Sequence, residues 1–208
     1  MIERVRDATM LGPDRLGALR RGVREISGSI PGCVVECGVA GGGSLALLAA
    51  ALAELGDSRE LHGFDTFSGM PTPNARDRAY GVGAELTHWG TGTCSAPERY
   101  VRELLDSLGV GARVTLHPGD FRDTLAPFAV ALREPIALLH ADGDWYESTK
   151  CIFECLWDRL APGAVVQIDD YGHWEGCRAA VDEFFASRGL RLSLERIDAT
   201  GHRLRKPA

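Results

Sequence analysis

Apolar residues recur along the chain in two patterns, one typical of amphipathic helices and one typical of buried strands. Four of them lie at helical spacing after Pro13, which predicts a helix over residues 13 to 27. The pattern further predicts strands at 33 to 38, 60 to 65, 112 to 117, 135 to 142 and 164 to 169, and helices at 43 to 55, 97 to 108, 147 to 160 and 175 to 188. Strand and helix in turn indicate an α/β fold with a mostly parallel sheet and helices on both faces.

Two regions depart from this alternation. Residues 190 to 196 and 202 to 205 are short alternating runs around Ala199-Thr200-Gly201, which predicts a closing antiparallel hairpin. Residues 67 to 96 hold prolines, glycines and isolated aromatic residues without a period, and we interpret them as a lid or acceptor loop rather than a disordered insertion. We therefore expect an N-terminal helical segment over 1 to 30 and a single domain over 31 to 208.

Composition narrows the class of protein. A chain of 208 residues with 45% apolar content can bury one substantial core, and a formal charge of −6 argues against a nucleic-acid partner. The start has no secretory signal pattern, and no apolar stretch is long enough to span a bilayer, so we expect a cytoplasmic protein without a membrane partner. Six cysteines without zinc-ligand spacing are expected to be reduced thiols.

Carboxylates follow two of the predicted strands. Asp142 and Asp144 follow the apolar run that ends at His140-Ala141, and Asp169 and Asp170 end the run Val165-Val166-Gln167-Ile168. Neighbouring parallel strands would deliver these acids to one edge of the sheet, where bare carboxylates repel and favour a hard cation such as Mg²⁺. The alternative is that each run is a core strand ending on helix N-caps, where Asp is common.

A Gly-rich turn follows the first strand, in Glu36-Cys37-Gly38-Val39-Ala40-Gly41-Gly42-Gly43-Ser44. Such a turn lets a ligand approach the backbone, and the helix behind it offers free N–H groups. Asp65 ends the next strand, where an acid can bind both hydroxyls of a ribose, so the ligand is expected to be a nucleoside. The glycine spacing differs from the dinucleotide pattern, and there is no P-loop.

Four ordered motifs carry a resemblance: Phe64-Asp65-Thr66-Phe67-Ser68-Gly69-Met70-Pro71, Gly119-Asp120-Phe121-Arg122-Asp123-Thr124-Leu125, Asp142-Gly143-Asp144-Trp145-Tyr146-Glu147-Ser148-Thr149, and Asp169-Asp170-Tyr171-Gly172 with Gly176-Cys177-Arg178. Over residues 30 to 190 the chain resembles the macrocin O-methyltransferase (TylF-like) family of class I S-adenosylmethionine-dependent methyltransferases. The resemblance implies a Rossmann-like domain and Mg²⁺-dependent transfer of a methyl group to a sugar hydroxyl of a glycosylated metabolite or saccharide. Typical members are longer before the Gly-rich strand, so a small or open acceptor site is expected.

The resemblance also implies roles for individual residues. It matches Asp142, Asp169 and Asp170 to metal ligands and Asp144 to the catalytic base. The expected S-adenosylmethionine site comprises Glu36, Gly38, Gly41, Ser44, Asp65, Thr66, Asp120, Phe121 and Asp142. His140 lies two residues before Asp142 on the same strand face, and it is a second candidate base or a buried core histidine.

Two other classes of function stay open at this point. A nucleotide-dependent oxidoreductase is disfavoured by the missing dinucleotide pattern and the lack of room for a substrate domain. In a non-catalytic metal-binding or regulatory α/β module, Asp142, Asp169 and Asp170 would be helix caps and loop acids. The sequence does not identify the acceptor, and it leaves a homodimer open.

Overall fold

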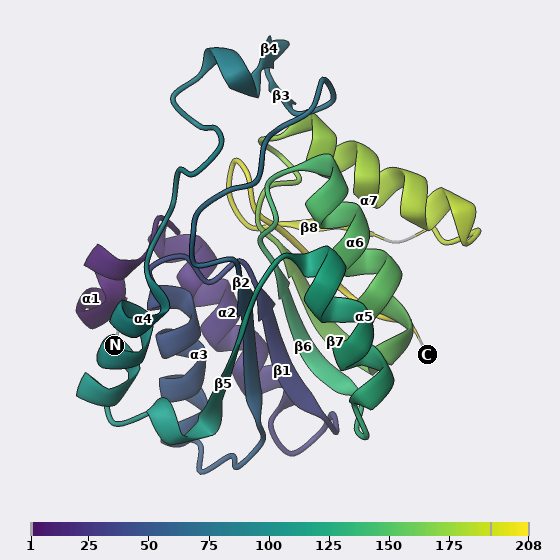
Figure 1. Ribbon diagram of the computed structural model, residues 1–208. Helices are drawn as coiled ribbons and strands as arrows, with labels where there is room; N and C mark the ends of the chain where they lie inside the picture. The colour runs from purple at the N-terminus through teal and green to yellow at the C-terminus, as the bar shows by residue number, and fades with distance from the viewer. Residues whose placement is uncertain (1, 192, 208) are drawn as a thin grey trace.

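A seven-stranded sheet forms the centre of the protein in a computed structural model that describes residues 2–191 and 193–207 (Figure 1). The strand order is β5-β2-β1-β6-β7-β9-β8; neighbours from β5 to β7 run parallel, whereas β9 is antiparallel to β7 and to β8. The strands are β1 (Cys33–Cys37), β2 (Leu61–Asp65), β5 (Val114–Pro118), β6 (Ile136–Ala141), β7 (Leu160–Ile168), β8 (Glu195–Arg196) and β9 (His202–Arg205). The predicted parallel sheet with an antiparallel closing hairpin is confirmed.

Helices cover both faces of this sheet (Figure 1). One layer contains α2 (Pro13–Ile26), α3 (Gly43–Glu54) and α4 (Glu98–Ser107), and the opposite layer contains α5 (Phe121–Ala131), α6 (Tyr146–Leu156) and α7 (Glu175–Ser187). The shorter elements are α1 (Ile2–Val5) and the 3₁₀ turns η1 (Arg6–Ala8), η2 (Ala84–Leu86), η3 (Gly111–Arg113) and η4 (Trp157–Arg159). None of the helices in the described residues is long and apolar enough to cross a membrane.

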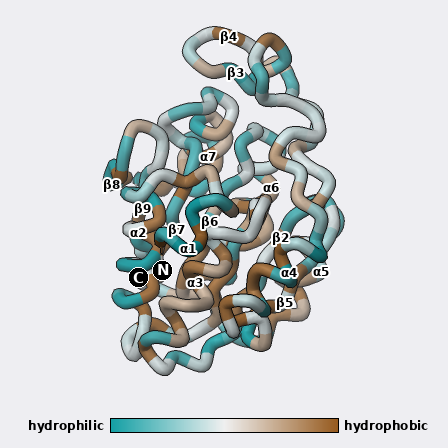
Figure 2. The backbone as a smooth tube through the Cα atoms, turned by 90° about the vertical axis from the view of Figure 1, so that its left-hand side faces the viewer, coloured by the Kyte–Doolittle hydropathy of each residue, from teal (hydrophilic) through white to brown (hydrophobic). Residues whose placement is uncertain are grey.

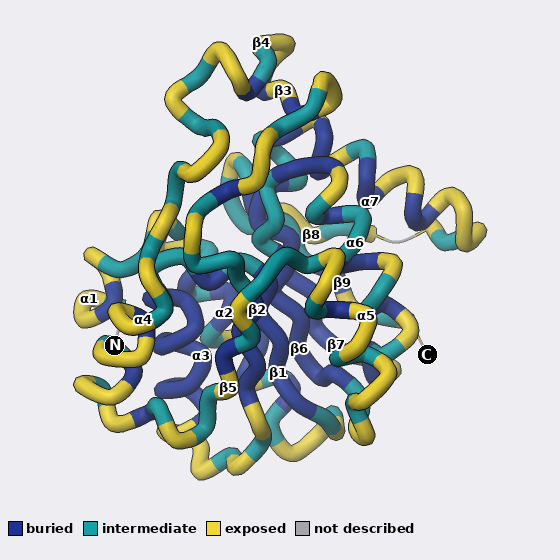
Figure 3. Tube along the Cα trace, in the orientation of Figure 1, coloured by how far each residue is buried: buried dark blue, intermediate teal, exposed yellow. Residues whose placement is uncertain are grey.

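The central strands β1 and β6 are largely apolar along their whole length because both faces of the sheet are buried there (Figure 3). Val34 and Leu138 point into the core shared with α2 and α3, whereas their neighbours Val35 and Leu139 point into the core under α5, α6 and α7. Complete burial of one such side chain stabilises the fold by ~1.5–3 kcal/mol. The two cores hold the strand ends, and the residues that follow them, in fixed positions.

The observed elements differ from the predicted ones in three places. The pattern did not predict α5, although Asp120 caps it by accepting a hydrogen bond from the Arg122 N–H; Pro127 inside the helix weakens its helical signal. The helix predicted over 147 to 160 ends at Leu156, and β7 therefore starts four residues earlier than predicted. Of the strand predicted over 190 to 196, residue 192 lies outside the described residues and β8 covers only Glu195–Arg196.

Backbone hydrogen bonds within the aperiodic loop over residues 67–96 join its two ends. At its neck, Met70 donates to the carbonyl of Thr93 and accepts from the N–H of Gly92, both at 2.8 Å. Gly69 has a φ of +98°, and an added Cβ would lie 2.5 Å from the Gly92 backbone, so this position requires glycine. The tip carries a small hairpin, β3 (Arg78–Ala79) with β4 (Val82–Gly83), which stands away from the main body in Figures 1 and 2.

Candidate active site

One cavity of about 590 Å³ opens at the carboxyl ends of the parallel strands. This edge is where open α/β sheets bind ligands. Its walls come from the Gly-rich turn, the residues that follow β2, β5, β6 and β7, the start of α2 and the loop over 67–96. Nine predicted site residues line it: Gly38, Asp65, Thr66, Asp120, Phe121, Asp142, Asp144, Asp169 and Asp170.

Four predicted site residues do not line the cavity: Glu36, Gly41, Ser44 and His140. Glu36 and His140 are completely buried, and strand register pairs them across β1 and β6, where Oε1 of Glu36 lies 2.7 Å from Nδ1 of His140. Ser44 is buried in the first turn of α3. The expected direct contacts of these residues with the cosubstrate or acceptor therefore have no support in the geometry.

The glycines of the Gly-rich turn are required by packing within the chain. Gly38 has a φ of +95°, and an added Cβ would lie 1.9 Å from the carbonyl oxygen of Asp142. At Gly41 and Gly43 an added Cβ would lie 2.7 and 2.8 Å from the carbonyl oxygen of Ala8. The N-terminal segment therefore packs against the outer side of this turn, and only part of the turn faces a ligand.

Asp65 ties the Gly-rich turn to the end of β2. Its Oδ2 accepts hydrogen bonds from the N–H groups of Val39 and Ala40, both at 2.8 Å, and its Oδ1 accepts one from Phe67 at 2.7 Å. A carboxylate has about four acceptor positions, so roughly one stays free for a ligand. The sequence predicted that Asp65 binds both ribose hydroxyls. The acceptor position that remains allows about one direct hydrogen bond to a ribose.

Asp120 is held by a charged partner within its own chain. Arg122 donates from Nε and Nη2 to the two carboxylate oxygens of Asp120, each at 2.9 Å. The hydrogen bonds from Arg122 lower the pKa of Asp120 and so keep it ionised. The carboxylates of Asp65 and Asp120 are both positioned by the protein before any ligand binds.

The acids that follow β6 and β7 lie close together. Oxygens of Asp142, Asp144 and Asp170 lie within 4.8 Å of one another. Burial, and next the charges of neighbouring acids, raise the pKa values of Asp142 and Asp170 well above the usual range. Burial also raises the pKa of Asp144 to about 7. Such shifts show that negative charge is costly in this part of the cavity.

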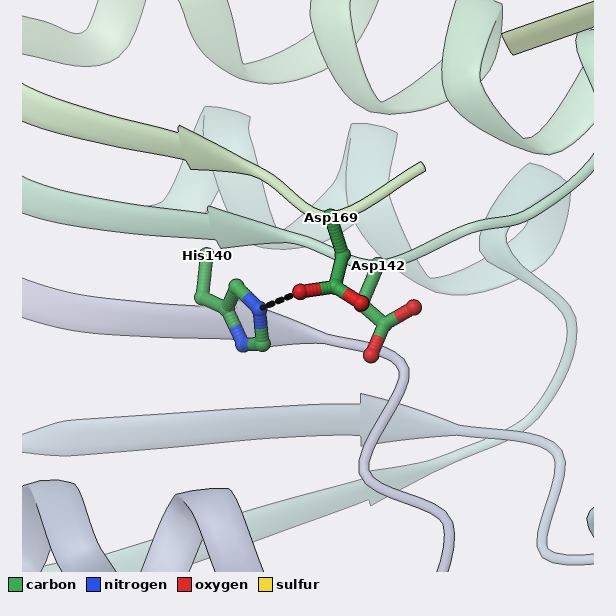
Figure 4. A group of neighbouring side chains, drawn as sticks. All are labelled: His140, Asp142 and Asp169. Carbon is green, nitrogen blue, oxygen red and sulfur yellow. Dashed lines mark ion pairs between the residues drawn. The ribbon is translucent and has the colours of Figure 1, made fainter. Parts of the chain in front are cut away.

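Asp169 contacts cationic groups on two sides. Its Oδ2 accepts a hydrogen bond from Nη1 of Arg15, and Nε of the same Arg15 lies 3.1 Å from Oδ2 of Asp198. Its Oδ1 points at Nε2 of His140 across 3.6 Å, while the other side of the carboxylate lies beside Asp142 (Figure 4). Burial disfavours the charged imidazole, but the carboxylates of Asp169 and Glu36 outweigh this and raise the pKa of His140 to about 9. His140 therefore contacts Asp169 from beneath the cavity.

The donor set fits a hard divalent cation. Oδ1 of Asp169 and Oδ2 of Asp170 are buried without a hydrogen-bond partner. Asp142 has an oxygen within 4.8 Å of ligand atoms in two overlapping groups, one with Asp169 and one with Asp170. Carboxylate oxygens are the ligands that Mg²⁺ and Ca²⁺ prefer, and buried oxygens without donors are costly unless a cation is bound.

Asp144 is oriented by Trp174. The indole Nε1 of Trp174 donates to Oδ1 of Asp144 at 3.1 Å, and Trp174 packs edge-to-face on Trp145 with ring centroids 4.7 Å apart. Asp144 has a φ of +53°, in the left-handed region that Asp tolerates better than most residues. This backbone turns the Asp144 side chain into the cavity rather than along the sheet.

Three cavity residues were not predicted to act at the site. Arg15 lies on the predicted N-terminal helix, to which the sequence pattern assigned no site residue, and Asp77 lies in a loop without periodicity. Trp174 follows the motif Asp169-Asp170-Tyr171-Gly172 closely in the sequence, but its hydrogen bond to Asp144 had no signal there. Each of these contacts joins segments far apart in the chain.

Comparison with known proteins gives consistent results. The family model described as macrocin-O-methyltransferase (TylF) matches residues 5–206. The chain is 37% identical over 196 residues to the 8-demethyl-8-(2,3-dimethoxy-alpha-L-rhamnosyl)-tetracenomycin-C 4'-O-methyltransferase of Streptomyces olivaceus, covering 93% of this chain and 73% of that protein. It is 32% identical over 201 residues to the demethyldecarbamoylnovobiocin O-methyltransferase of Streptomyces niveus, with the same two coverages of 93% and 73%.

A solved structure has the same arrangement of elements. The O-methyltransferase NovP superposes with a TM-score of 0.86 at 30% identity, over 97% of this chain and 83% of that one.

Proposed function

The chain belongs to the macrocin O-methyltransferase (TylF) family and is an S-adenosylmethionine-dependent O-methyltransferase, and from this premise we propose that it methylates a sugar hydroxyl of a small glycosylated metabolite in a Mg²⁺-dependent reaction. Membership in this family removes the oxidoreductase and the non-catalytic module as explanations of the site. The proposal has three parts: the acceptor, the cosubstrate site and the metal with its base.

The names of the relatives support a glycosylated acceptor. The Streptomyces olivaceus relative is named for methylation at the 4' position of a rhamnosyl tetracenomycin. The cavity of this chain offers Trp89, Trp145 and Trp174 beside the acids, and aromatic faces of this kind pack well on sugar rings. A rhamnosyl group on an aromatic aglycone is therefore the acceptor type that we test first.

The residues that follow β1, β2 and β5 form the S-adenosylmethionine site of the proposal. Gly38 and the Gly-rich turn lie where the amino acid part of the cosubstrate would bind. Asp65 offers its remaining acceptor position to the ribose, and Asp120 and Phe121 flank the adenine. Charge-assisted hydrogen bonds of this type are each worth ~1.5–3 kcal/mol.

The acids that follow β6 and β7 form the catalytic half. Asp142, Asp169 and Asp170 would hold the Mg²⁺ ion, which when bound lowers the pKa of a coordinated hydroxyl. Asp144 faces the cavity, with Oδ1 held by Trp174, and takes the proton from the acceptor hydroxyl. The sulfonium is already a good methyl donor, so orienting and deprotonating the acceptor is the step that these residues serve.

One observation carries the proposal. The four aspartates that follow β6 and β7 line one cavity beside a Gly-rich turn, and within the described residues two of their buried oxygens lack any hydrogen-bond partner. A site built only to hold a nucleoside would not concentrate this many carboxylates beside it.

The test is a methylation assay with purified protein, S-adenosylmethionine and MgCl₂. The acceptors are the rhamnosyl tetracenomycin that lacks the 4'-methyl group, demethyldecarbamoylnovobiocin, and the corresponding aglycones without sugar. We expect mass spectrometry to find one added methyl group on a glycoside and none on an aglycone. Methylation of an aglycone hydroxyl with no methylation of any glycoside would contradict the sugar acceptor.

A further inference from the structure

Asp77 is a completely buried carboxylate in the loop over residues 67–96. Its Oδ2 accepts a hydrogen bond from the N–H of Asn74 in the same loop, at 2.7 Å. Its Oδ1 accepts one from the N–H of Tyr146, the first residue of α6, also at 2.7 Å. The side chain thus joins the loop to a helix that lies 69 residues further along the chain.

Two helix N-termini converge on this carboxylate. The N-cap residue of α6, Trp145, gives the helix no side-chain cap, so Asp77 supplies the acceptor that its free N–H groups need. In the first turn of α7, an added Cβ at Gly176 would lie 2.3 Å from Oδ1 of Asp77. Anions are favoured at helix N-termini, and here one buried anion accepts a hydrogen bond from the first residue of α6 and packs against the first turn of α7.

These are the two helices that follow the acidic strand ends. The backbone runs from Asp144 through Trp145 directly into α6, and from Asp170 through a short turn into α7. The indole N–H of Trp145 also donates to the carbonyl oxygen of Pro71 in the loop, at 2.8 Å. The position of the loop is therefore coupled to the position of Asp144.

The ion pair between the loop and α7 at the same junction is exposed to solvent. Arg76 and Glu183 form an ion pair at 3.1 Å, but both side chains are about half exposed, at 51% and 53%. Exposed pairs of this kind contribute little to stability. The buried bonds of Asp77, together with the bond of Trp145 to Pro71 and the burial of Ala79 and Ala84, are therefore expected to contribute more to the attachment of the loop than this ion pair.

We propose that Asp77 is a positioning residue for methyl transfer: it fastens the loop over 67–96 to the N-terminus of α6 and thereby fixes Asp144 and the adjoining wall of the cavity. The role of Asp144 in this inference rests on the proposed function. The attachment of the loop does not, and the two parts can be measured separately.

The first test is limited trypsin digestion of Asp77→Asn. The amide can accept one N–H but must face the other with its own NH₂ group, so one of the two hydrogen bonds is lost. Cleavage after Arg76 and Arg78 then follows the open population of the loop, and we expect it to be at least about tenfold faster than in wild type. The matched control is Glu183→Gln, which removes an exposed carboxylate at the same junction and keeps both cleavage sites; its rate should stay within about twofold of wild type.

The second test reads the surroundings of Asp144 without an acceptor or a metal. In a ¹H–¹⁵N spectrum the indole N–H of Trp174, assigned with Trp174→Phe, reports its hydrogen bond to Asp144. We expect this resonance to move or broaden in Asp77→Asn but not in Glu183→Gln, while titration with S-adenosylhomocysteine gives the wild-type affinity. Gly176→Ala, which pushes the carboxylate away but keeps its charge, should act in the same direction if Asp77→Asn does not fold.

Turnover of the rhamnosyl tetracenomycin probe completes the test. We expect kcat of Asp77→Asn to fall at least about tenfold, with the KM for S-adenosylmethionine unchanged. Unchanged trypsin cleavage would overturn the attachment itself. Faster cleavage with an unchanged Trp174 resonance and an unchanged kcat would mean that Asp77 only attaches the loop, and would overturn its positioning role. A wild-type protein that methylates none of the glycosides contradicts the proposed function alone, because the digestion and the spectrum do not depend on it.

Discussion

Asp65 and Asp170 line the same cavity, each at the carboxyl end of a parallel strand. Both carboxylate oxygens of Asp65 accept hydrogen bonds, whereas one oxygen of Asp170 has no hydrogen-bond partner among the described residues. The Asp65 carboxylate accepts three backbone N–H groups, and Asp120 beside it is paired with Arg122. Asp170 has a buried oxygen without a partner, and carboxylate oxygens of Asp142, Asp144 and Asp170 lie within 4.8 Å of one another. In the cosubstrate half of the cavity, the carboxylates of Asp65 and Asp120 are already paired with hydrogen-bond donors of the protein. In the acidic half, the carboxylates that follow β6 and β7 outnumber the cationic groups that contact them.

Because of this difference, we expect the cosubstrate half to bind S-adenosylmethionine and the acidic half to bind a divalent cation. Carboxylates that already accept backbone N–H groups are preorganised for a neutral or cationic nucleoside. Crowded carboxylates, with Arg15 as the cation that contacts Asp169, become favourable once a divalent cation adds positive charge. We therefore expect S-adenosylmethionine binding and metal binding to be separable.

Removal of the metal is expected to have the largest effect. With excess EDTA, methylation of the glycoside probe should be lost completely, because Asp142, Asp169 and Asp170 would no longer hold the ion that activates the acceptor hydroxyl. Turnover is measured before and after addition of MgCl₂, which should restore it. Full activity in excess EDTA would show that the acidic half serves another purpose.

Replacement of the proposed base comes next. Asp144→Asn keeps the shape and the Trp174 contact but cannot accept a proton, so kcat should fall about 10²- to 10⁴-fold. Steady-state kinetics measure this loss, and binding of S-adenosylhomocysteine should be retained. His140 is the rival base, and since it does not line the cavity, His140→Gln should cost less kcat. If His140→Gln is inactive while Asp144→Asn stays within a few-fold of wild type, the assignment of the base is wrong.

The cosubstrate half is tested by Asp65→Ala. The variant loses the ribose hydrogen bond and leaves the N–H groups of Val39 and Ala40 without their acceptor, so S-adenosylmethionine should bind at least about tenfold more weakly. Calorimetry measures the affinity, and circular dichroism checks the fold. Wild-type affinity would remove Asp65 from the cosubstrate site.

The smallest predicted effect is a loss of stability of the folded protein at acid pH, caused by the half-buried His117 at the end of β5. His117 stacks on Phe64 and lies 3.2 Å from His62; burial, and next the charge of His62, lower the pKa of His117 to about 4. The unfolded chain binds this proton near its ordinary pKa of about 6.5, so stability is complete above that pH and is lost as the pH falls toward 4. Melting temperatures of His117→Phe should fall less between pH 7 and pH 4.5 than those of wild type, by a few degrees. The exposed control His88→Phe should behave like wild type; equal acid sensitivity of wild type and His117→Phe would contradict the prediction.

The strands and most helices could be predicted from the sequence because burial of both sheet faces leaves long apolar runs. Acids such as Asp142 and Asp170 could be predicted from their place at strand ends. Helix α5 could not, because Pro127 interrupts its pattern, and Asp120 was interpreted only as a ligand residue although it also caps this helix. The pairing of Glu36 with His140 depends on strand register, and the anchoring by Asp77 depends on tertiary packing, so neither leaves a local signal.

The separation of the two halves is the central claim, and calorimetry tests it most directly. EDTA-treated wild type, Asp65→Ala and Asp170→Asn are each titrated with S-adenosylhomocysteine and, separately, with MgCl₂. We predict that S-adenosylhomocysteine binds wild type and Asp170→Asn equally well without metal, and that the heat of Mg²⁺ binding is lost in Asp170→Asn but retained in Asp65→Ala. A requirement of Mg²⁺ for S-adenosylhomocysteine binding, or an unchanged Mg²⁺ isotherm in Asp170→Asn, would contradict the account.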